Sequence, residues 1–181
     1  MQPYKTRSDL TMDLALVAGL VALDVIARLA PHVPGVWPVA ASALFAGRML
    51  RMPLLAFVVP LAAMVLSNFV LPGDDGRVML FIAAALFVPA LLGIVGRRWR
   101  GVVPTAAAMI ASSLVFFVAT NFAVWAFQDL YPRTLQGLAQ CYFAALPFLD
   151  RTVLGDLAWC AALFGGAWLV QRAPALARRA H

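Results

Sequence analysis

Six apolar stretches divide this chain, and their lengths constrain its fold more than any other feature. They lie near 12–30, 36–50, 54–71, 79–96, 105–127 and 152–171. An α-helix rises about 1.5 Å per residue, so about 20 apolar residues cross the roughly 30 Å hydrocarbon core of a bilayer. Only the stretch at 36–50 is clearly short. With 64% hydrophobic residues, we predict an all-α integral membrane protein with six transmembrane helices in a single domain over 1–181.

Basic residues fall into clusters that alternate between the apolar stretches. Most of the 14 Lys and Arg residues lie at the two ends of the chain or in two loops: Lys5, Arg7, Arg48, Arg51, Arg97, Arg98, Arg100, Arg172, Arg178 and Arg179. Because basic loops remain in the cytoplasm, the pattern predicts that both termini are cytoplasmic. The connections at 31–36, 72–78 and 128–151 are then expected to face outward.

The composition also excludes several classes of protein. The net charge of +6 comes from short clusters beside the apolar stretches, a pattern typical of contact with anionic lipid headgroups and not of nucleic-acid binding. The chain has no phosphate-binding loop, no His-Glu metal motif and no Gly-x-Ser-x-Gly motif. An intramembrane enzyme using Asp24, His32 or Cys141 would lack a paired nucleophile and base. We therefore expect neither enzymatic activity nor a resident cofactor.

The segment near 134–148 is a seventh apolar stretch of a different kind. About twelve apolar residues are too few to cross a bilayer. Pro132 and Arg133 precede the segment, Pro147 lies at its end, and Asp150 follows it. We predict a short amphipathic or re-entrant helix on the outward side, separate from the last span.

The outward half of the first span carries two charged residues, and the span also has a row of small ones. Asp24 and Arg28 are four residues apart and share a helix face. Because a charge in the bilayer centre costs about 2.5–3.5 kcal/mol, they either form an ion pair that fixes helix packing or line a polar cavity. The small residues that recur at four-residue spacing are Ala15, Ala18, Gly19 and Ala22. They allow another helix to approach closely, either within this chain or from a separate membrane protein. Gly165 and Gly166 suggest a second close crossing.

Polar and aromatic residues gather toward the predicted outward ends of the spans. These candidate substrate-binding residues are Asp24, Arg28, His32, Asn68, Thr120, Asn121, Trp125, Tyr131 and Tyr142. Aromatic rings provide apolar contact area and a few polar groups orient a ligand, as in most small-molecule sites. The alternative is a membrane scaffold whose polar residues only pack helices. A pocket requires these side chains to converge at the outward end.

Several short motifs, in a fixed order over about 25–171, resemble one known group of proteins. They are Arg28-Leu-Ala-Pro-His32, 38–47, 60–67, Phe116-Phe117, Thr120-Asn121, Trp125, 131–134, Gly137-Leu138, Cys141-Tyr142, Pro147-Phe148, Gly155-Asp156 and 163–165. Together they resemble small bacterial inner-membrane proteins related to the S-components of energy-coupling-factor (ECF) vitamin transporters. The resemblance implies six helices with cytoplasmic termini and a vitamin bound on the outward face. It also implies a coupling membrane protein with two ATPases, docked on the small residues of the first helix.

Within this group the sequence is similar to solitary cobalamin-uptake proteins, in which a cysteine thiolate of an outward loop can ligate cobalt. This chain departs from that pattern, because the loop at 72–80 contains no cysteine. His32 and Cys141 are then the remaining outward candidates for a cobalt contact. The resemblance implies uptake of cobalamin, another corrinoid or another vitamin.

Overall fold

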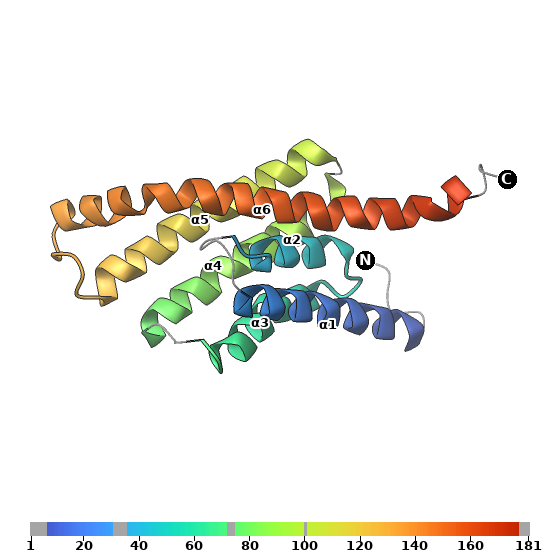
Figure 1. Cartoon of the computed structure of the whole chain (residues 1–181), viewed down its shortest axis with the longest axis horizontal. Coiled ribbons are helices and arrows are strands. Elements are labelled where there is room, and N and C mark those ends of the chain that lie inside the picture. The colour runs from blue at the N-terminus through green and yellow to red at the C-terminus, as the bar shows by residue number, and fades with distance from the viewer. Residues whose placement is uncertain (1–6, 31–35, 72–74, 100, 178–181) are drawn as a thin grey trace.

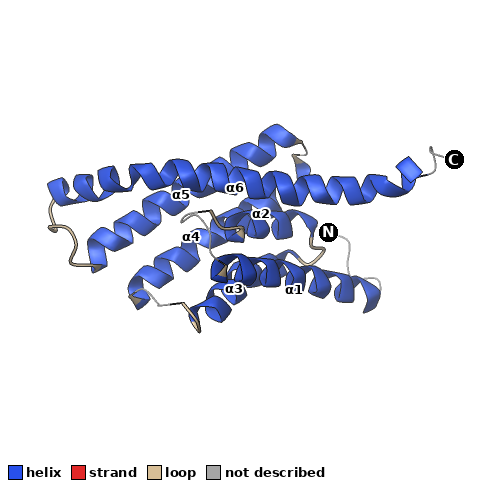
Figure 2. Ribbon diagram, in the orientation of Figure 1, coloured by secondary structure: helices blue, strands red, loops and turns tan. Residues whose placement is uncertain are grey.

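The described part of the computed structural model consists of helices joined by loops, without a strand (Figure 2). It covers residues 7–30, 36–71, 75–99 and 101–177, with side chains described up to residue 172. The elements are α1 (Arg7–Leu29), α2 (Val39–Met49), the 3-10 helix η1 (Pro53–Phe57), α3 (Val58–Asn68), α4 (Gly76–Val95), the 3-10 helix η2 (Gly96–Arg98), α5 (Val102–Phe127) and α6 (Leu135–Ala177). The prediction of an all-α protein is confirmed.

Four helices in the described ranges are long and apolar enough to cross a membrane: Arg7–Leu29, Gly76–Arg98, Val102–Phe127 and Leu135–Arg172. The other two predicted spans are shorter. With 11 residues, α2 rises only about 16 Å, and η1 with α3 rises about 26 Å. The count of six spans therefore stays a prediction, while a membrane protein with several apolar helices is supported.

The prediction of a separate helix at 134–148 is wrong. These residues form the first third of α6, which runs without interruption for 43 residues and is about 64 Å long. Pro147 lies inside the helix without ending it. The physical reason is a tertiary contact with the antiparallel α5. The thiol of Cys141 and the hydroxyl of Tyr142 donate hydrogen bonds to backbone carbonyls of α5. That partner holds this part of α6 in line with the rest of the helix.

Figure 1 shows how the helices are arranged. α5 and α6 form a long hairpin, and its closed end extends beyond α1, α2 and α3. We call the end of the molecule where α5 turns into α6 the hairpin end. The opposite end, where α1 begins and α6 finishes, is called the terminal end. α2 and α4 end toward the terminal end, whereas α1 and α3 end toward the hairpin end (Figure 1).

α2 is the central helix, and most of its residues are buried. It crosses α4 in direct backbone contact at a pair of glycines. A Cβ atom on Gly47 would lie 2.4 Å from the carbonyl oxygen of Ala90, and one on Gly93 would lie 2.4 Å from that of Leu44. Small residues are typical of close helix crossings in membranes. The short α2 is therefore held by intimate packing against a long apolar helix.

Charged residues tie the helices together at the terminal end. Asp13 of α1 accepts hydrogen bonds from the backbone N–H groups of Arg51 and Met52, at 3.2 and 2.9 Å. The side chain of Arg97 donates to the carbonyls of Gly47 and Leu50, at 2.8 and 2.6 Å. Backbone carbonyls at a helix C-terminus lack partners within the helix, and these bonds satisfy them. The basic turns thus have structural roles in addition to their predicted effect on orientation.

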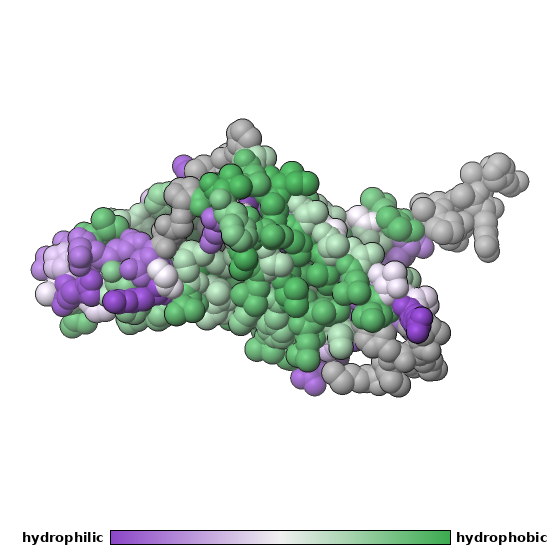
Figure 3. Space-filling view, turned by 90° about the horizontal axis from the view of Figure 1, so that it is seen from below, coloured by the Kyte–Doolittle hydropathy of each residue, from purple (hydrophilic) through white to green (hydrophobic). Residues whose placement is uncertain are grey.

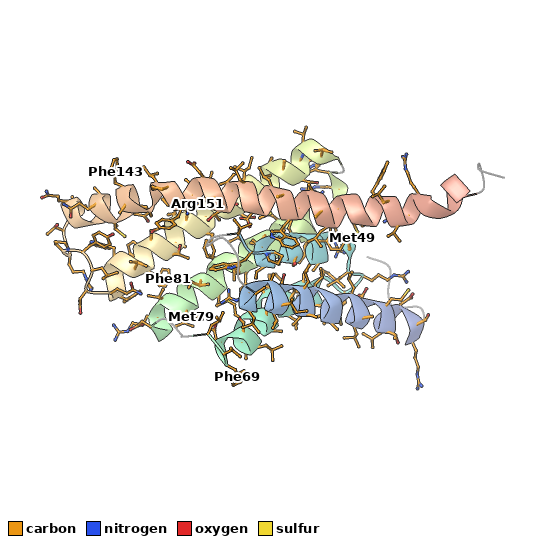
Figure 4. All side chains as sticks on the ribbon, viewed as in Figure 1. Met49, Phe69, Met79, Phe81, Phe143 and Arg151 are labelled. Carbon is orange, nitrogen blue, oxygen red and sulfur yellow. The ribbon has the colours of Figure 1, made fainter. Side chains whose placement is uncertain are left out.

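The surface is apolar over the middle of the molecule, and hydrophilic side chains gather at the hairpin end (Figure 3). Large apolar side chains project outward from the helices. Phe69 and Phe143 are 81% and 77% exposed, and both point away from the bundle in Figure 4. Extensive exposed apolar surface is rare on soluble monomers and is expected where lipid covers a protein.

Candidate functional site

A cavity of about 220 Å³ lies in the half of the molecule toward the hairpin end. Each of the six described α-helices contributes to its wall. Its polar lining comes from Arg28, Asn68, Thr152 and Asp156, and its aromatic lining from Trp37 and Phe116. Aliphatic and methionine side chains of α2, α3 and α4 complete it. A mostly apolar cavity with a few convergent polar groups is the usual form of a small-molecule site.

Arg28 is held at this cavity by the end of α3. Its Nε donates to the hydroxyl of Ser67 at 2.8 Å, and its Nη2 donates to Oδ1 of Asn68 at 3.4 Å. The guanidinium also lies 5.3 Å from the centroid of the Trp37 ring. Ser67 is itself fixed, because its hydroxyl donates to the carbonyl of Ala63 at 2.7 Å. A positive charge is thus positioned on the cavity wall by contacts from two other segments.

Asp156 provides the acidic group of the cavity. It lies near the middle of α6, and its Oδ2 accepts a hydrogen bond of 2.6 Å from the hydroxyl of Ser113 on α5. From the sequence, Asp156 was quoted only as part of a motif, so its place in the cavity wall was missed. So were those of Trp37, Phe116 and Thr152. One signal was available for Thr152 and Asp156, which are four residues apart and therefore share a helix face.

Asp24 lies outside the cavity lining and is fully buried. Ser42 of α2 donates to its Oδ1 at 2.7 Å, and its Oδ2 has no hydrogen-bond partner. The ion pair between Asp24 and Arg28, one of the two roles considered for these residues, is not among those formed by the described side chains. Arg28 is directed to Ser67 and Asn68 instead. Asp24 therefore joins α1 to α2 through a hydroxyl.

This arrangement predicts how substitutions of Asp24 differ. Asp24→Ala removes the acceptor of a buried hydroxyl and should lower the free energy of unfolding by about 1–3 kcal/mol. Asp24→Asn should cost less, because an amide oxygen can still accept from Ser42. Asp150→Ala, at an exposed residue of α6, should change stability by no more than about 0.5 kcal/mol. Thermal unfolding in one detergent compares the three variants. An Asp24→Asn variant as unstable as Asp24→Ala would contradict the role assigned to Ser42.

Four other candidate residues form hydrogen bonds within α5, from α5 to the loop that follows it, or from α6 to α5. The side chains of Thr120 and Asn121 donate to backbone carbonyls one turn earlier, each at 2.8 Å. Nε1 of Trp125 donates to the carbonyl of Pro132 at 2.9 Å, and the hydroxyl of Tyr142 donates to that of Val118 at 2.7 Å. None of the four lines the cavity. The structure therefore separates them from Arg28 and Asn68.

The remaining candidates lie elsewhere. Tyr131 is half-buried beside the turn of the hairpin, away from the cavity lining, and His32 lies outside the described residues. Cys141 is only 2% exposed, and its thiol donates to the carbonyl of Asn121 at 3.4 Å. A buried thiol between two helices is poorly placed for an outward cobalt contact. Over the described ranges, no three His, Cys, Asp or Glu side chains gather as a metal site.

The small residues of α1 face away from the rest of the described chain. The residues Ala15, Ala18, Gly19 and Ala22 are all exposed, and a Cβ atom on Gly19 would have nothing within 4 Å. α1 packs instead through its opposite face, which includes Val17 and Leu20. Contact of this row with another helix of the same chain, one of the two alternatives, is therefore wrong. The close crossing suggested at Gly165 and Gly166 is also not formed, since a Cβ atom on either would meet nothing.

Comparison with known proteins places the chain in a family. The sequence model of a family of unknown function (DUF6580) matches residues 8–177. The chain belongs to this family. The matched region includes the cavity, the hairpin and the exposed row of small residues. No curated protein and no solved structure matches the chain.

Proposed function

We propose that this protein binds a small molecule in the 220 Å³ cavity and acts as a substrate-binding component of membrane uptake, in the manner of an ECF S-component. The observation that carries the proposal is the convergence of all six α-helices on one cavity that holds a cation, a carboxyl group and two aromatic rings. Helix packing alone favours filled space, so it does not account for a cavity lined by these groups. The resemblance described for the sequence supports the same function.

The orientation follows from charge. Six spans with cytoplasmic termini would place the terminal end on the cytoplasmic side of a bacterial inner membrane and the hairpin end on the outward side. The basic turns that contain Arg48, Arg51, Arg97 and Arg98 all belong to the terminal end, as the positive-inside rule requires. The cavity then lies toward the outward side, from which a substrate arrives.

The volume of the cavity favours a compact ligand. Pockets for drug-sized molecules enclose about 300–1,000 Å³, and this cavity of about 220 Å³ is smaller. A whole corrinoid would leave most of its macrocycle outside. Arg28 is a suitable partner for a carboxylate or phosphate of the ligand. Among vitamin-type molecules we therefore favour a compact anionic one over cobalamin or another corrinoid.

The exposed small residues of α1 support a partner in the membrane. Ala15, Ala18, Gly19 and Ala22 form a face that no other part of the described chain covers. In lipid, such a face allows close approach of a helix from another protein. We assign it to a coupling membrane protein with ATPases, which would supply the energy that this chain alone has no motif to provide.

A membrane scaffold is the second candidate, and one observation favours it. Thr120, Asn121, Trp125 and Tyr142 all form hydrogen bonds within the hairpin, as residues that only hold helices together would. Binding measurements separate the two functions. Calorimetry of the protein in lipid nanodiscs would test nicotinate, pantothenate and biotin as compact carboxylates, with thiamine as a cationic control. Binding of one carboxylate supports the transport component, and binding of none of them favours the scaffold.

For cobalamin we predict a negative result. The protein purified after incubation with cyanocobalamin should carry no visible corrinoid absorption, because the cavity is small and Cys141 is buried. The measurement is a visible absorption spectrum of the detergent-purified protein, with the Cys141→Ala variant in parallel. A stoichiometric corrinoid band would contradict the preference for a compact ligand. Loss of that band in a His32→Ala variant would then identify the cobalt contact.

A further inference from the structure

A second, larger cavity lies toward the terminal end, and its lining shares no residue with that of the cavity described above. It encloses about 1010 Å³ between the first turns of α5 and the last part of α6, and the ends of α2 and η2 close it. We call it the terminal groove. Its wall is mostly apolar, with Leu157, Ala161 and Phe164 among the contributing residues. Among the described residues that line it there is no acid.

Arg48 brings a positive charge into the terminal groove. Its Nη1 donates to the hydroxyl of Thr105 at 2.5 Å, and its guanidinium lies 5.6 Å from the centroid of the Phe164 ring. Its Nε is buried and has no hydrogen-bond partner. No carboxylate within the described ranges forms an ion pair with Arg48. Arg48 contributes to the groove lining, and a cation without a carboxylate partner in a mostly apolar groove is suited to an anionic ligand.

The mouth of the terminal groove has the composition of a bilayer interface. Trp99 and Trp168 line it and are 55% and 50% exposed. The guanidinium of Arg98 lies 4.9 Å from the Trp99 ring, and that of Arg172 lies 4.3 Å from the Trp168 ring. Tryptophan is enriched at the level of lipid headgroups, and basic side chains there attract anionic lipids. Arg97 adds another cation to the lining.

We propose that the terminal groove binds one anionic phospholipid. The phosphate lies against Arg48 and Arg97, and an acyl chain follows the apolar wall toward Leu157. A free phosphate would use the two arginines but not the apolar wall, whereas a neutral lipid would use the wall but not the charge. The volume falls at the upper end of the range of ordinary ligand pockets. This site is separate from the small-molecule cavity and does not depend on its function.

The test compares variants that fill the groove or remove its charge. Gly165→Leu adds a side chain to the groove wall, where a Cβ atom would meet nothing within 4 Å. Gly166→Leu is its matched control, since it has equally open surroundings but lies outside the lining. Arg48→Gln removes the charge, and Arg77→Gln is its control, because Arg77 likewise stacks on a phenylalanine ring, 5.7 Å from the centroid of Phe127.

Each protein is loaded with phosphatidylglycerol, and retained lipid is counted by native mass spectrometry. We expect one lipid per wild-type chain, retention reduced about tenfold in Gly165→Leu and Arg48→Gln, and no change in the two controls. Equal retention in Gly165→Leu and wild type would overturn the proposal, even if Arg48→Gln failed to fold. Equal binding of phosphatidylcholine, displacement by inorganic phosphate at millimolar concentration, or a lipid-free dimer would also overturn it.

Discussion

Leucine at Gly47 or Gly93 is expected to prevent the bundle from forming. The Cβ atom of either substitution would lie 2.4 Å from a backbone carbonyl oxygen of the opposed helix. Overpacking against side chains costs about 1–3 kcal/mol, because side chains can shift. Here the neighbours are backbone atoms of α2 and α4, so relief requires the two helices to separate. Separation would remove the packing of the central helix. We therefore expect the free energy of unfolding to fall by more than about 3 kcal/mol.

The measurement is the yield of monodisperse protein by size-exclusion chromatography, followed by the thermal unfolding midpoint of whatever folds. Gly19→Leu is the matched control, because it also places leucine at a glycine of an apolar helix. A Cβ atom there meets nothing within 4 Å, so yield and midpoint should remain close to wild type. A Gly47→Leu protein as stable as Gly19→Leu would show that α2 and α4 do not cross as described.

These glycines also show what the sequence was able to predict about the fold. Apolar length correctly identified helical segments, because each long stretch must satisfy its own backbone hydrogen bonds in lipid. The contact between Gly47 and Gly93 was missed, since it depends on which faces of two helices meet. The row from Ala15 to Ala22 has the same small-residue character as that crossing, yet it lies on the outside. Local spacing identifies a surface that permits close approach, but does not identify its partner.

The error at 134–148 has a related cause. Pro147 and the neighbouring Asp150 and Arg151 resemble a helix boundary, and both charged residues are exposed. The packing of α5 along α6 outweighs that local signal, because the hydroxyl of Tyr142 is bonded across the hairpin. A proline in a helix removes one backbone hydrogen bond and favours a kink, but it does not end a helix that a neighbour supports.

The cost of burying polar groups predicted residues of the candidate site better than their position along a helix did. Arg28 and Asn68, two of the candidate residues, line the same cavity and are joined by a hydrogen bond, as expected for charged and amide groups in apolar spans, which need partners. Thr120 and Asn121 share the polar character, but their side chains bond to carbonyls one turn back. Such local bonding is common for these residues in helices and satisfies them without a pocket. Phe116 was quoted only as part of a motif, because an aromatic residue in an apolar helix has no distinguishing pattern.

Arg28→Gln is expected to reduce affinity for an anionic ligand by about 10- to 100-fold, the equivalent of about 1.4–2.7 kcal/mol. The reason is the loss of a hydrogen bond to a charged group, which is worth about 1.5–3 kcal/mol. Glutamine keeps a donor for Ser67 and Asn68, so the end of α3 retains a contact. Arg28→Lys should have an intermediate effect, because it preserves the charge but not the planar fork that matches a carboxylate.

This difference in affinity is measured by calorimetry in nanodiscs, with the carboxylate (nicotinate, pantothenate or biotin) that binds the wild type. The control is Arg151→Gln, on the exposed face of α6. The unfolding midpoint of each variant separates lost affinity from lost structure. If the Arg28→Gln protein binds the carboxylate as tightly as wild type, Arg28 does not contact the ligand. The hydrogen bonds of Arg28 to Ser67 and Asn68 would then serve only to join α1 to α3, as a scaffold requires.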